Sequence, residues 1–503
     1  MATTYLLLAA VFLPFLWGAG LLLTPVKEGP EALAAQDKRA AAFALSGIVL
    51  TGLVTLALIV LYAGGEQAQL TLLTLTGSLR IRFALDGLGV FFLCFIPVIW
   101  LLSGIYSLEY LKHEDHRKRF WGFYLLTLGT LQGLSLSGDL VTMYLFFELM
   151  TLVSMPLVLH TQSHEAVMAA LKYLLYSMAG AFMALFGIFV FYQYGGGTDF
   201  TAGGVVDAAA AAENGGILHL GVFLMILGFG VKAGMFPMHA WLPTAHPVAP
   251  SPASAVLSAI IVKGGVLAIL RSVFYAYGAE LIRGTWVQTA WLILACFTVF
   301  MGSMLAYNEQ VFKKRLAYSS VSQASYVLLG LASLDSVAMT GALLHVLFHA
   351  IMKTALFLTA GTIIYKTGKT RVDELTGIGK EMPVTMWCFT FASLSLVGIP
   401  PASGFISKWY LATGLLDSGL SVFRWLGPVI LLVSALLTAG YLLPITIHGF
   451  LPGNDYDYTT LEKKDPNLRM LLPLFILAAL AILTGVFPGG IVTRLLALTQ
   501  AML

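Results

Sequence analysis

Six ionisable side chains lie inside stretches of the sequence that are otherwise apolar enough to cross a membrane. They are Glu148, Lys172, Lys232, Lys263, Lys353 and Lys408. Even on the mildest scale, a charge near the centre of a bilayer costs at least about 2.5–3.5 kcal/mol. We therefore expect the fold to hold these groups in a polar interior, as proteins that move ions or protons do.

The composition agrees with a multi-pass membrane protein. Of the 503 residues, 58% are hydrophobic and only 11% are charged, whereas soluble domains carry roughly 25% charged residues. Because a span needs about 20 apolar residues, the sequence predicts an all-α polytopic fold with about 14 transmembrane helices. The expected spans are 4–23, 41–63, 83–105, 120–137, 139–159, 167–194, 217–243, 253–276, 287–307, 316–334, 337–365, 384–411, 424–449 and 470–488. The first span lacks a basic leader and a cleavage site, so we expect a retained helix; a short helix is expected from 489 onward.

The loops predict the orientation, because cytoplasmic loops carry an excess of lysine and arginine. One side holds Lys27, Lys38, Arg39, Lys112, Arg117, Lys118, Arg119, Lys313, Lys314, Arg315, Lys366, Lys369, Arg371, Lys380, Lys463, Lys464 and Arg469. The other side holds Arg80, Arg82, Arg283, Arg424 and Arg494. The sequence therefore predicts a cell-membrane protein with the first set in the cytoplasm and both termini outside. The loops are too short for a soluble catalytic domain, and no basic–aromatic cluster indicates nucleic acid.

The cysteines argue against redox chemistry in this chain. Cys94, Cys296 and Cys388 are isolated in apolar spans, and no C-x-x-C occurs. Iron–sulfur ligation and a disulfide framework are therefore disfavoured. With no nucleotide or haem motif either, the sequence predicts no cofactor, and any enzymatic role is that of a translocase component beside partner redox subunits.

Two spans contain helix-breaking residues beside their lysines. The breakers are Gly234, Pro237 and Pro243 in the seventh span and Gly398, Pro400 and Pro401 in the twelfth. Proline removes a backbone donor, and hydrocarbon tolerates that defect only inside protein or beside a hydrated cavity. Interrupted helices at corresponding places indicate an inverted-repeat transporter, with ordinary proline kinks as the alternative. The predicted units are three N-terminal helices in 1–119, a five-helix repeat in 120–276, its inverted copy in 287–449, and a C-terminal helix in 470–503.

Glu148 is expected to pair with a lysine. Alone in hydrocarbon the carboxyl group would be protonated, and a nearby ammonium group would keep it charged. Lys232, at a similar depth two spans later, is the natural partner, and Lys172 is a competitor that would form a supporting ion pair. A purely structural ion pair between helices is the alternative.

Lys263 lies centrally in the eighth span. Gly264 and Gly265 beside it permit close helix approach or local hydration. A buried lysine without a carboxylate partner is expected to give and take a proton readily.

The eleventh span carries His345, His349 and Lys353 at i, i+4 and i+8. This spacing stacks them on one helix face, about 6 Å apart, close enough for a water molecule between neighbours. Core packing is the alternative for a single histidine, but less so for three residues in register. Two histidines at i and i+4 can also chelate zinc. However, no third ligand lies nearby and the lysine would repel a metal, so no metal site is predicted.

The predicted groups form an order along the chain. The order is Glu148, Lys232, Lys263, His345, His349, Lys353 and Lys408. It predicts a lateral proton relay across the middle of the membrane that ends in its outer half.

At this point the chain resembles a known family, the antiporter-like membrane subunits of respiratory complex I, Mrp-type sodium/proton antiporters and membrane-bound hydrogenases. The stretches that carry the resemblance are FFELMTL around Glu148, GVKAGMFPMHAWLPTAHPVAPSPASAVLSAIIVKGGV at 230–266, HVLFHAIMKTALFLTAG and GIPPASGFISKWY. The resemblance implies fourteen helices with two inverted five-helix bundles, and partner membrane subunits. It implies that Glu148 and Lys232 are the coupling pair, Lys263 the central lysine and Lys408 the terminal group. The family uses lysine or glutamate at the terminal position, so Lys408 favours the Mrp D-type subunit and its hydrogenase counterpart.

Together these observations predict proton transport gated by electrostatics. Separation of Glu148 from Lys232 would let Lys232 repel a proton from Lys263 toward Lys408. Two like charges about 7 Å apart at an effective dielectric near 20 interact by about 2.4 kcal/mol. Water is expected to fill the gaps between the groups. The alternatives are a structural scaffold, whose interior charges would be paired and dispensable, and a subunit that carries sodium itself, which the lysine-rich interior disfavours.

Overall fold

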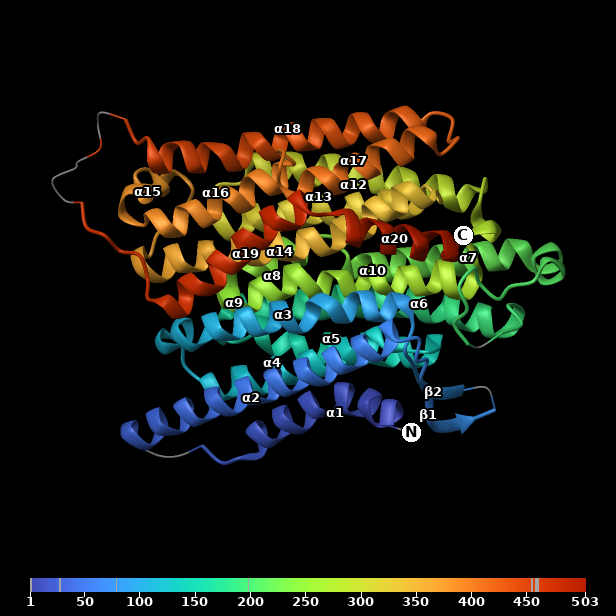
Figure 1. The fold of residues 1–503 in the computed structure, drawn as a ribbon, viewed down its shortest axis with the longest axis horizontal. Helices are drawn as coiled ribbons and strands as arrows, with labels where there is room; N and C mark the ends of the chain where they lie inside the picture. Colours follow the sequence, from blue (N-terminus) through green and yellow to red (C-terminus); the bar gives the residue numbers. More distant parts are fainter. Residues whose placement is uncertain (1, 27–28, 78, 198, 454–455, 457–460) are drawn as a thin grey trace.

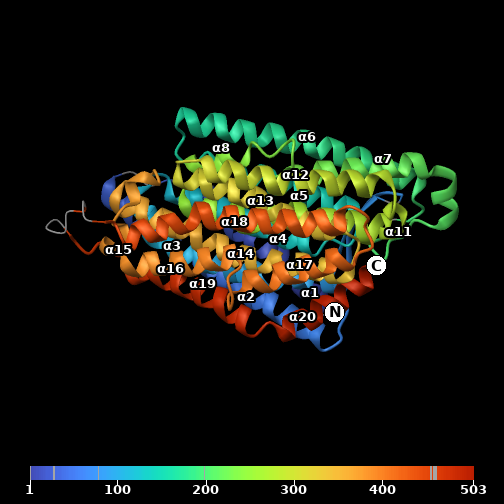
Figure 2. The ribbon, with the colours of Figure 1, turned by 90° about the horizontal axis from the view of Figure 1, so that it is seen from above.

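The protein is a bundle of helices that run side by side along its longest axis (Figure 1) and are stacked in several layers (Figure 2). The computed structural model describes residues 2–26, 29–77, 79–197, 199–453, 456 and 461–503. The α-helices are α1 (Ala2–Leu23), α2 (Pro30–Ala63), α3 (Gly87–Tyr110), α4 (Arg117–Ser135), α5 (Leu140–Val158), α6 (His164–Tyr194), α7 (Ala208–Lys232), α8 (Leu242–Val248), α9 (Ser251–Val256), α10 (Val262–Leu270), α11 (Ala279–Ile282), α12 (Trp286–Asn308), α13 (Phe312–Ala332), α14 (Ser336–Thr367), α15 (Ile378–Glu381), α16 (Pro383–Val397), α17 (Ser403–Asp417), α18 (Phe423–Phe450), α19 (Leu468–Val486) and α20 (Gly489–Met502). Helix α20 confirms the short helix expected from 489 onward.

The number of helices suited to span a membrane is lower than predicted. Among the described residues, 11 helices are long and apolar enough, instead of about 14. The predicted spans 120–137 and 316–334 correspond to α4 and α13, which carry three basic residues each in their first turn and contain serine and glutamine. Both are largely buried among other helices, so they need no continuous apolar face toward lipid. The predicted span 384–411 is divided into α16 and α17, each too short to cross alone.

Both predicted helix breaks are present. Gly234 and Gly398 have φ values of +79° and +93°, a left-handed conformation that favours glycine. Pro237, Pro400 and Pro401 lie in the non-helical connections that follow these glycines. Pro243 does not break a helix, contrary to the prediction.

Pro243 instead lies in the first turn of α8. Proline suits that position because the first amides of a helix have no intrahelical acceptor.

The sequence analysis missed a β-hairpin. Strands β1 (Gln69–Thr76) and β2 (Leu79–Ala84) pair antiparallel, and their alternation of apolar with polar residues is the signal that was overlooked. The hairpin lies at the same end of the bundle as both chain termini (Figure 1). We call this the hairpin end.

The opposite end gathers the basic loops, and we call it the basic end. There α3 and α14 finish and α4, α13 and α19 begin (Figure 1). Most of the predicted basic residues lie in or beside these connections, whereas Lys38 and Arg39 lie in the first third of α2 and Lys27 is outside the described residues. The structure therefore separates the two sets of loop charges as the sequence predicts.

The eighth span contains a buried cation that was also missed. Arg271 is fully buried and donates to Asp86 Oδ1 at 2.8 Å and to the Ser135 carbonyl oxygen at 3.3 Å. Asp86 also accepts from the amide of Gly89 at the start of α3. Because each charge has its partner, this pair is explained as a link between α3 and the eighth span.

Candidate functional site

The first group of predicted residues surrounds Lys232 at the C-terminal end of α7. The lysine is buried, and its Nζ donates to the hydroxyl groups of Thr151, Tyr173 and Ser177 at 2.8, 2.7 and 3.1 Å. Its ammonium group also lies 4.2 Å from the centre of the Tyr173 ring. Three hydroxyls and an aromatic face therefore replace water around this cation.

The predicted direct ion pair is wrong in this structure. The ion pairs of the described residues include none between Glu148 and Lys232, although the two groups act on each other electrostatically. Glu148 is half-buried, and the described residues give its Oε1 no hydrogen-bond partner. Lys172 forms no ion pair with it either and donates to Thr244 at 3.0 Å. The hydroxyls of α5 and α6 have taken the place of the carboxylate, which the sequence pattern did not indicate.

Helix α10 meets α7 beside Lys232 through Gly265. A Cβ atom at this glycine would lie 2.6 Å from the Phe229 carbonyl oxygen, 2.8 Å from the Ala233 amide nitrogen and 2.9 Å from Lys232 Cβ. The predicted close helix approach is therefore present. It brings the helix of Lys263 against the helix of Lys232, without a hydrogen bond between the two lysines among the described contacts.

Gly265→Ala is expected to disturb this approach, because the added methyl group meets backbone atoms that cannot rotate away. Overpacking of this kind typically costs about 1–3 kcal/mol. We expect a lower melting temperature of the assembled protein, followed by tryptophan fluorescence. Gly216→Ala in α7 is the matched control, since nothing lies within 4 Å of its added Cβ. Equal stability of the two variants would contradict the prediction.

The second group begins with a direct contact between Lys263 and His349. Lys263 Nζ lies 2.5 Å from His349 Nδ1 and donates to the Ser258 carbonyl oxygen at 2.7 Å. Both side chains are buried, on α10 and α14. Ser258 belongs to a π-helical turn, Leu257–Ile261, just before α10, an irregularity frequent at functional sites. The expected water between Lys263 and this histidine is not needed.

His345 follows His349 along α14 as predicted, so Lys263, His349 and His345 form a row of titratable side chains. The rings of His345 and His349 stack with centroids 5.6 Å apart. His345 Nδ1 lies 2.9 Å from Ser407 Oγ, and its Nε2 lies 3.0 Å from Gln323 Oε1. Both ring nitrogens therefore have a polar partner, on α17 and α13 respectively. Gln323 was missed, although a glutamine inside an apolar span is a visible signal.

Lys408 lies close to the residues that contact His345. It follows Ser407 on α17, and its Nζ lies 5.2 Å from the centre of the Tyr326 ring, which stacks on His345 at 5.3 Å. Its Nζ donates to the Leu396 and Val397 carbonyl oxygens at 2.7 and 2.9 Å.

These carbonyls are at the end of α16, where a cation is favoured by unpaired acceptors and the helix dipole. Beyond the break, α17 runs toward the hairpin end (Figure 1).

Lys353 lies on the other side of His349 from His345, toward the basic end. It lies one turn beyond His349 toward the basic end, since α14 finishes there. Its Nζ donates to the Leu316 carbonyl oxygen at 2.9 Å and to the Ser319 hydroxyl, both on α13. The predicted i, i+4, i+8 register holds, but Lys353 forms a branch toward the basic end and not a step between His349 and Lys408.

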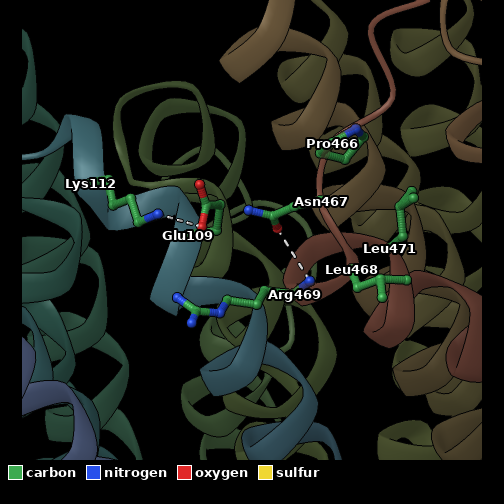
Figure 3. Close-up of a pocket in the computed structure, with 7 residues that line it drawn as sticks. All are labelled: Glu109, Lys112, Pro466, Asn467, Leu468, Arg469 and Leu471. Carbon is green, nitrogen blue, oxygen red and sulfur yellow. Dashed lines mark hydrogen bonds and ion pairs between the residues drawn. The ribbon is translucent and has the colours of Figure 1, made fainter.

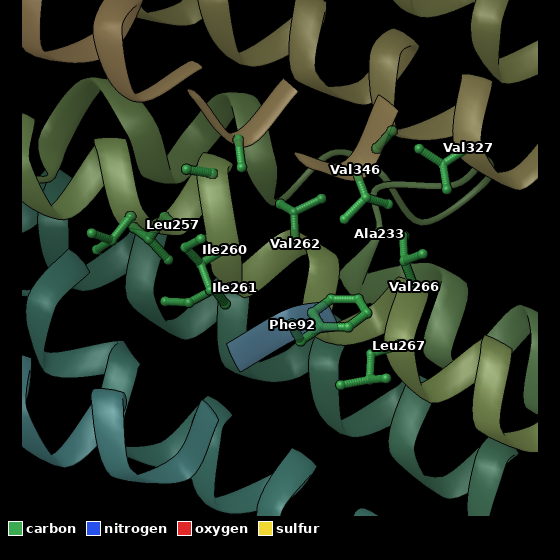
Figure 4. Packing of buried hydrophobic residues seen from close by; sticks show 14 of the residues in the cluster. Phe92, Ala233, Leu257, Ile260, Ile261, Val262, Val266, Leu267, Val327 and Val346 are labelled. Carbon is green, nitrogen blue, oxygen red and sulfur yellow. The ribbon is translucent and has the colours of Figure 1, made fainter. Parts of the chain in front are cut away.

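An apolar layer surrounds the middle of the row. Figure 4 shows Ile260, Ile261 and Leu267 of the eighth span packed with other buried apolar residues, among them Phe92 of α3 and Val346 of α14. A pocket of about 690 Å³ lies elsewhere, between the end of α3 and the start of α19. Figure 3 shows it lined by the Glu109–Lys112 ion pair and by Arg469. The polar row is therefore enclosed by hydrocarbon side chains, and that cavity is separate from it.

The described residues hold no group of three or more His, Cys, Asp or Glu side chains placed to bind a metal ion. The nitrogen atoms of the row come from lysine and histidine, with glutamine, serine and tyrosine beside them. Lysine, histidine and tyrosine are side chains of the kinds that act as proton donors and acceptors in proteins.

Comparison with known proteins gives a consistent match. Residues 137–450 match the family described as NADH:quinone oxidoreductase/Mrp antiporter, transmembrane, and residues 73–121 match the complex I chain 5 N-terminus. The chain is 31% identical to NADH-quinone oxidoreductase subunit N of Desulforudis audaxviator, over 83% of this chain and 84% of that protein. It is 27% identical to the D-type subunit of the Na⁺/H⁺ antiporter of Alkalihalophilus pseudofirmus, over 95% and 93%. Relatives of both kinds match, so the D-type assignment remains a prediction.

Solved structures share the fold. A chain of the Mrp complex from Dietzia sp. superposes with a TM-score of 0.84 at 22% identity, covering 100% of this chain and 97% of that one. A chain of the archaeal membrane-bound sulfane sulfur reductase gives 0.83 at 23%, covering 99% and 96%. Respiratory complex I from Thermus thermophilus gives 0.81 at 24%, covering 99% and 98%. All three are multi-subunit membrane complexes.

Proposed function

Because the chain belongs to the NADH:quinone oxidoreductase/Mrp antiporter membrane family, we propose that it translocates protons as one subunit of a multi-subunit membrane complex. The observation that carries the proposal is the contact of Lys263 Nζ with His349 Nδ1 at 2.5 Å, inside the bundle. It joins two titratable nitrogens on helices that are far apart in the sequence. The proton path is Lys263, His349, His345 and then Lys408.

In this mechanism Lys263, His349 and His345 carry the proton, and Glu148 and Lys232 control it. A proton moves between the Lys263 amine and His349, passes to His345 beside it, and leaves by the Ser407 hydroxyl toward Lys408. Glu148 and Lys232 control the charge next to Lys263, and the Gly265 contact supports this coupling because it joins their helices. A change in a partner subunit that moves Glu148 toward or away from Lys232 alters the potential at Lys263.

The proposal includes the finer architecture that the sequence predicts. It has fourteen spans, with α4, α13 and the α16–α17 pair added to the apolar eleven, and inverted repeats in 120–276 and 287–449. Corresponding contacts support it: α6 packs on α8 as α14 packs on α17, and α7 packs on α10 as α16 packs on α18. The basic end faces the cytoplasm and both termini face outward.

The scaffold alternative expects paired interior charges. Among the ion pairs of the described residues, none includes Lys232, Lys263, Lys353 or Lys408. A buried ammonium group without a counter-charge is costly, and a scaffold gains nothing from four of them. This observation favours transport over a scaffold role.

Lys408→Gln tests the proposal in the assembled complex, reconstituted in vesicles with a pH-sensitive dye inside. The amide still donates to the α16 carbonyls but does not titrate, so we expect proton transport to fall about 100-fold. Lys366→Gln, at the exposed end of α14, is the control. Normal proton transport in Lys408→Gln would favour the scaffold, and sodium movement in its place, measured with ²²Na⁺, would favour a sodium carrier.

A further inference from the structure

His246 is a buried histidine that the proposed relay does not use. It lies on α8, just past the first helix break, with 1% of its surface exposed. The described residues give neither ring nitrogen a hydrogen-bond partner. Buried polar atoms are almost always paired with protein or ordered water, and two unpaired nitrogens on one ring are a considerable cost. The described protein groups therefore leave both nitrogens open to a proton-carrying water molecule.

The surroundings of His246 are cationic. Its ring stacks on Phe357 of α14 at 4.5 Å, and Lys353 Nζ lies 6.0 Å from the centre of the same Phe357 ring. Lys313, Lys353 and Lys263, on α13, α14 and α10, all act on it electrostatically. Lys263 is the first group of the proposed path and Lys353 is the branch beside it, whereas Lys313 lies at the basic end.

A pocket at the basic end begins at Pro247, the residue that follows this histidine. It has a volume of about 330 Å³, and its lining includes Pro247 to Pro250, Glu114 and Lys313. Lys313 is 6% exposed and donates to the Ala249 carbonyl oxygen at 2.5 Å. Glu114 and Lys313 lie outside the predicted spans 120–137 and 316–334 and act on each other. Burial raises the pKa of the Glu114 carboxyl and lowers the pKa of the Lys313 ammonium to about 7.

We propose that His246 carries protons between the Glu114–Lys313 pocket at the basic end and the buried lysines Lys353 and Lys263. The Lys313 ammonium gives up one proton, which a water molecule of the pocket delivers to one ring nitrogen of His246. The imidazolium then releases the proton on its other nitrogen to the neutral amine of Lys353 or Lys263. Such a transfer needs both ring nitrogens unbound by protein, as they are here. The inference rests on the proton relay proposed above and adds its uptake branch.

The test is the initial rate of proton uptake from the side of the basic end, in vesicles of the assembled complex. His246→Phe retains stacking on Phe357, and we expect the rate to fall about 100-fold. His160→Phe is the matched control, because His160 is 2% exposed and the described residues give its ring nitrogens no hydrogen-bond partner either, yet it lies beside Arg119 and Phe120 and not beside the buried lysines. An unchanged rate in this control supports a role specific to His246.

A second readout separates transport from structure. In the wild type the uptake rate should rise as pH falls through about 7, where Lys313 becomes protonated. Lys313→Met should remove this step from the pH profile. If His246→Phe fails to assemble, the Lys313→Met profile decides: a retained step near pH 7 overturns the inference.

The outcomes also separate this inference from the proposed function. Normal uptake in His246→Phe, with no transport in Lys263→Met, overturns the His246 branch and leaves the relay intact. Normal transport in Lys263→Met overturns both.

Discussion

Lys263→Met should abolish proton transport by the assembled complex while the complex remains intact. Methionine fills most of the buried volume, so the cavity that alanine would leave, costing about 2–5 kcal/mol, is avoided. What is lost is the amine that lies 2.5 Å from His349 Nδ1. Because no other described titratable group is hydrogen-bonded to His349, the proposed path is cut at its first step. The measurement is dye-reported proton movement in reconstituted vesicles, normalised to assembled complex.

Lys263→Arg gives the chemical control for this expectation. The guanidinium group keeps the positive charge and its hydrogen bonds, but it hardly releases a proton at physiological pH. If charge alone were required, the arginine variant would transport normally. We expect it to be impaired like the methionine variant, and full activity in Lys263→Arg would refute the exchange of a proton at this position.

His349→Gln should reduce proton transport by about 100-fold, as expected when a positioned proton carrier is removed. The amide is close in size and can still accept from Lys263, so assembly and melting temperature should change little. The stacked pair of His345 and His349 would lose one of its two titratable rings. His448→Gln, at an exposed position near the end of α18, is the matched control. Equal transport by the two glutamine variants would remove His349 from the path.

Much of the site followed from periodicity and burial cost. The i, i+4 spacing of His345 and His349 predicts stacked rings because 3.6 residues make one helical turn, and the rings do stack. Gly234 and Gly398 predict breaks because their conformation is open to glycine alone at low cost. These are local properties, so neighbouring residues determine them.

The partners across helices did not follow from the sequence. Glu148 and Lys232 have opposite charges and similar depths in the membrane. Lys232 nevertheless donates to the hydroxyl groups of Thr151, Tyr173 and Ser177. Opposite charge alone does not say how each helix is rotated about its axis. For the same reason the bonding of His345 to Gln323 and Ser407 was not foreseen.

The sequence by itself determined the class of protein, the positions of the interior charges and the breaks in two helices, since these depend on hydrophobicity, spacing and backbone freedom. Only the tertiary structure decided that Lys263 touches His349 and that Lys353 branches toward the basic end. It also decided that His246 lies near Lys353 on one side and near the Glu114–Lys313 pocket on the other. The contact between Lys263 and His349, for example, joins residues 86 positions apart. They depend on how helices rotate and pack, and glycines such as Gly265 set how closely they approach.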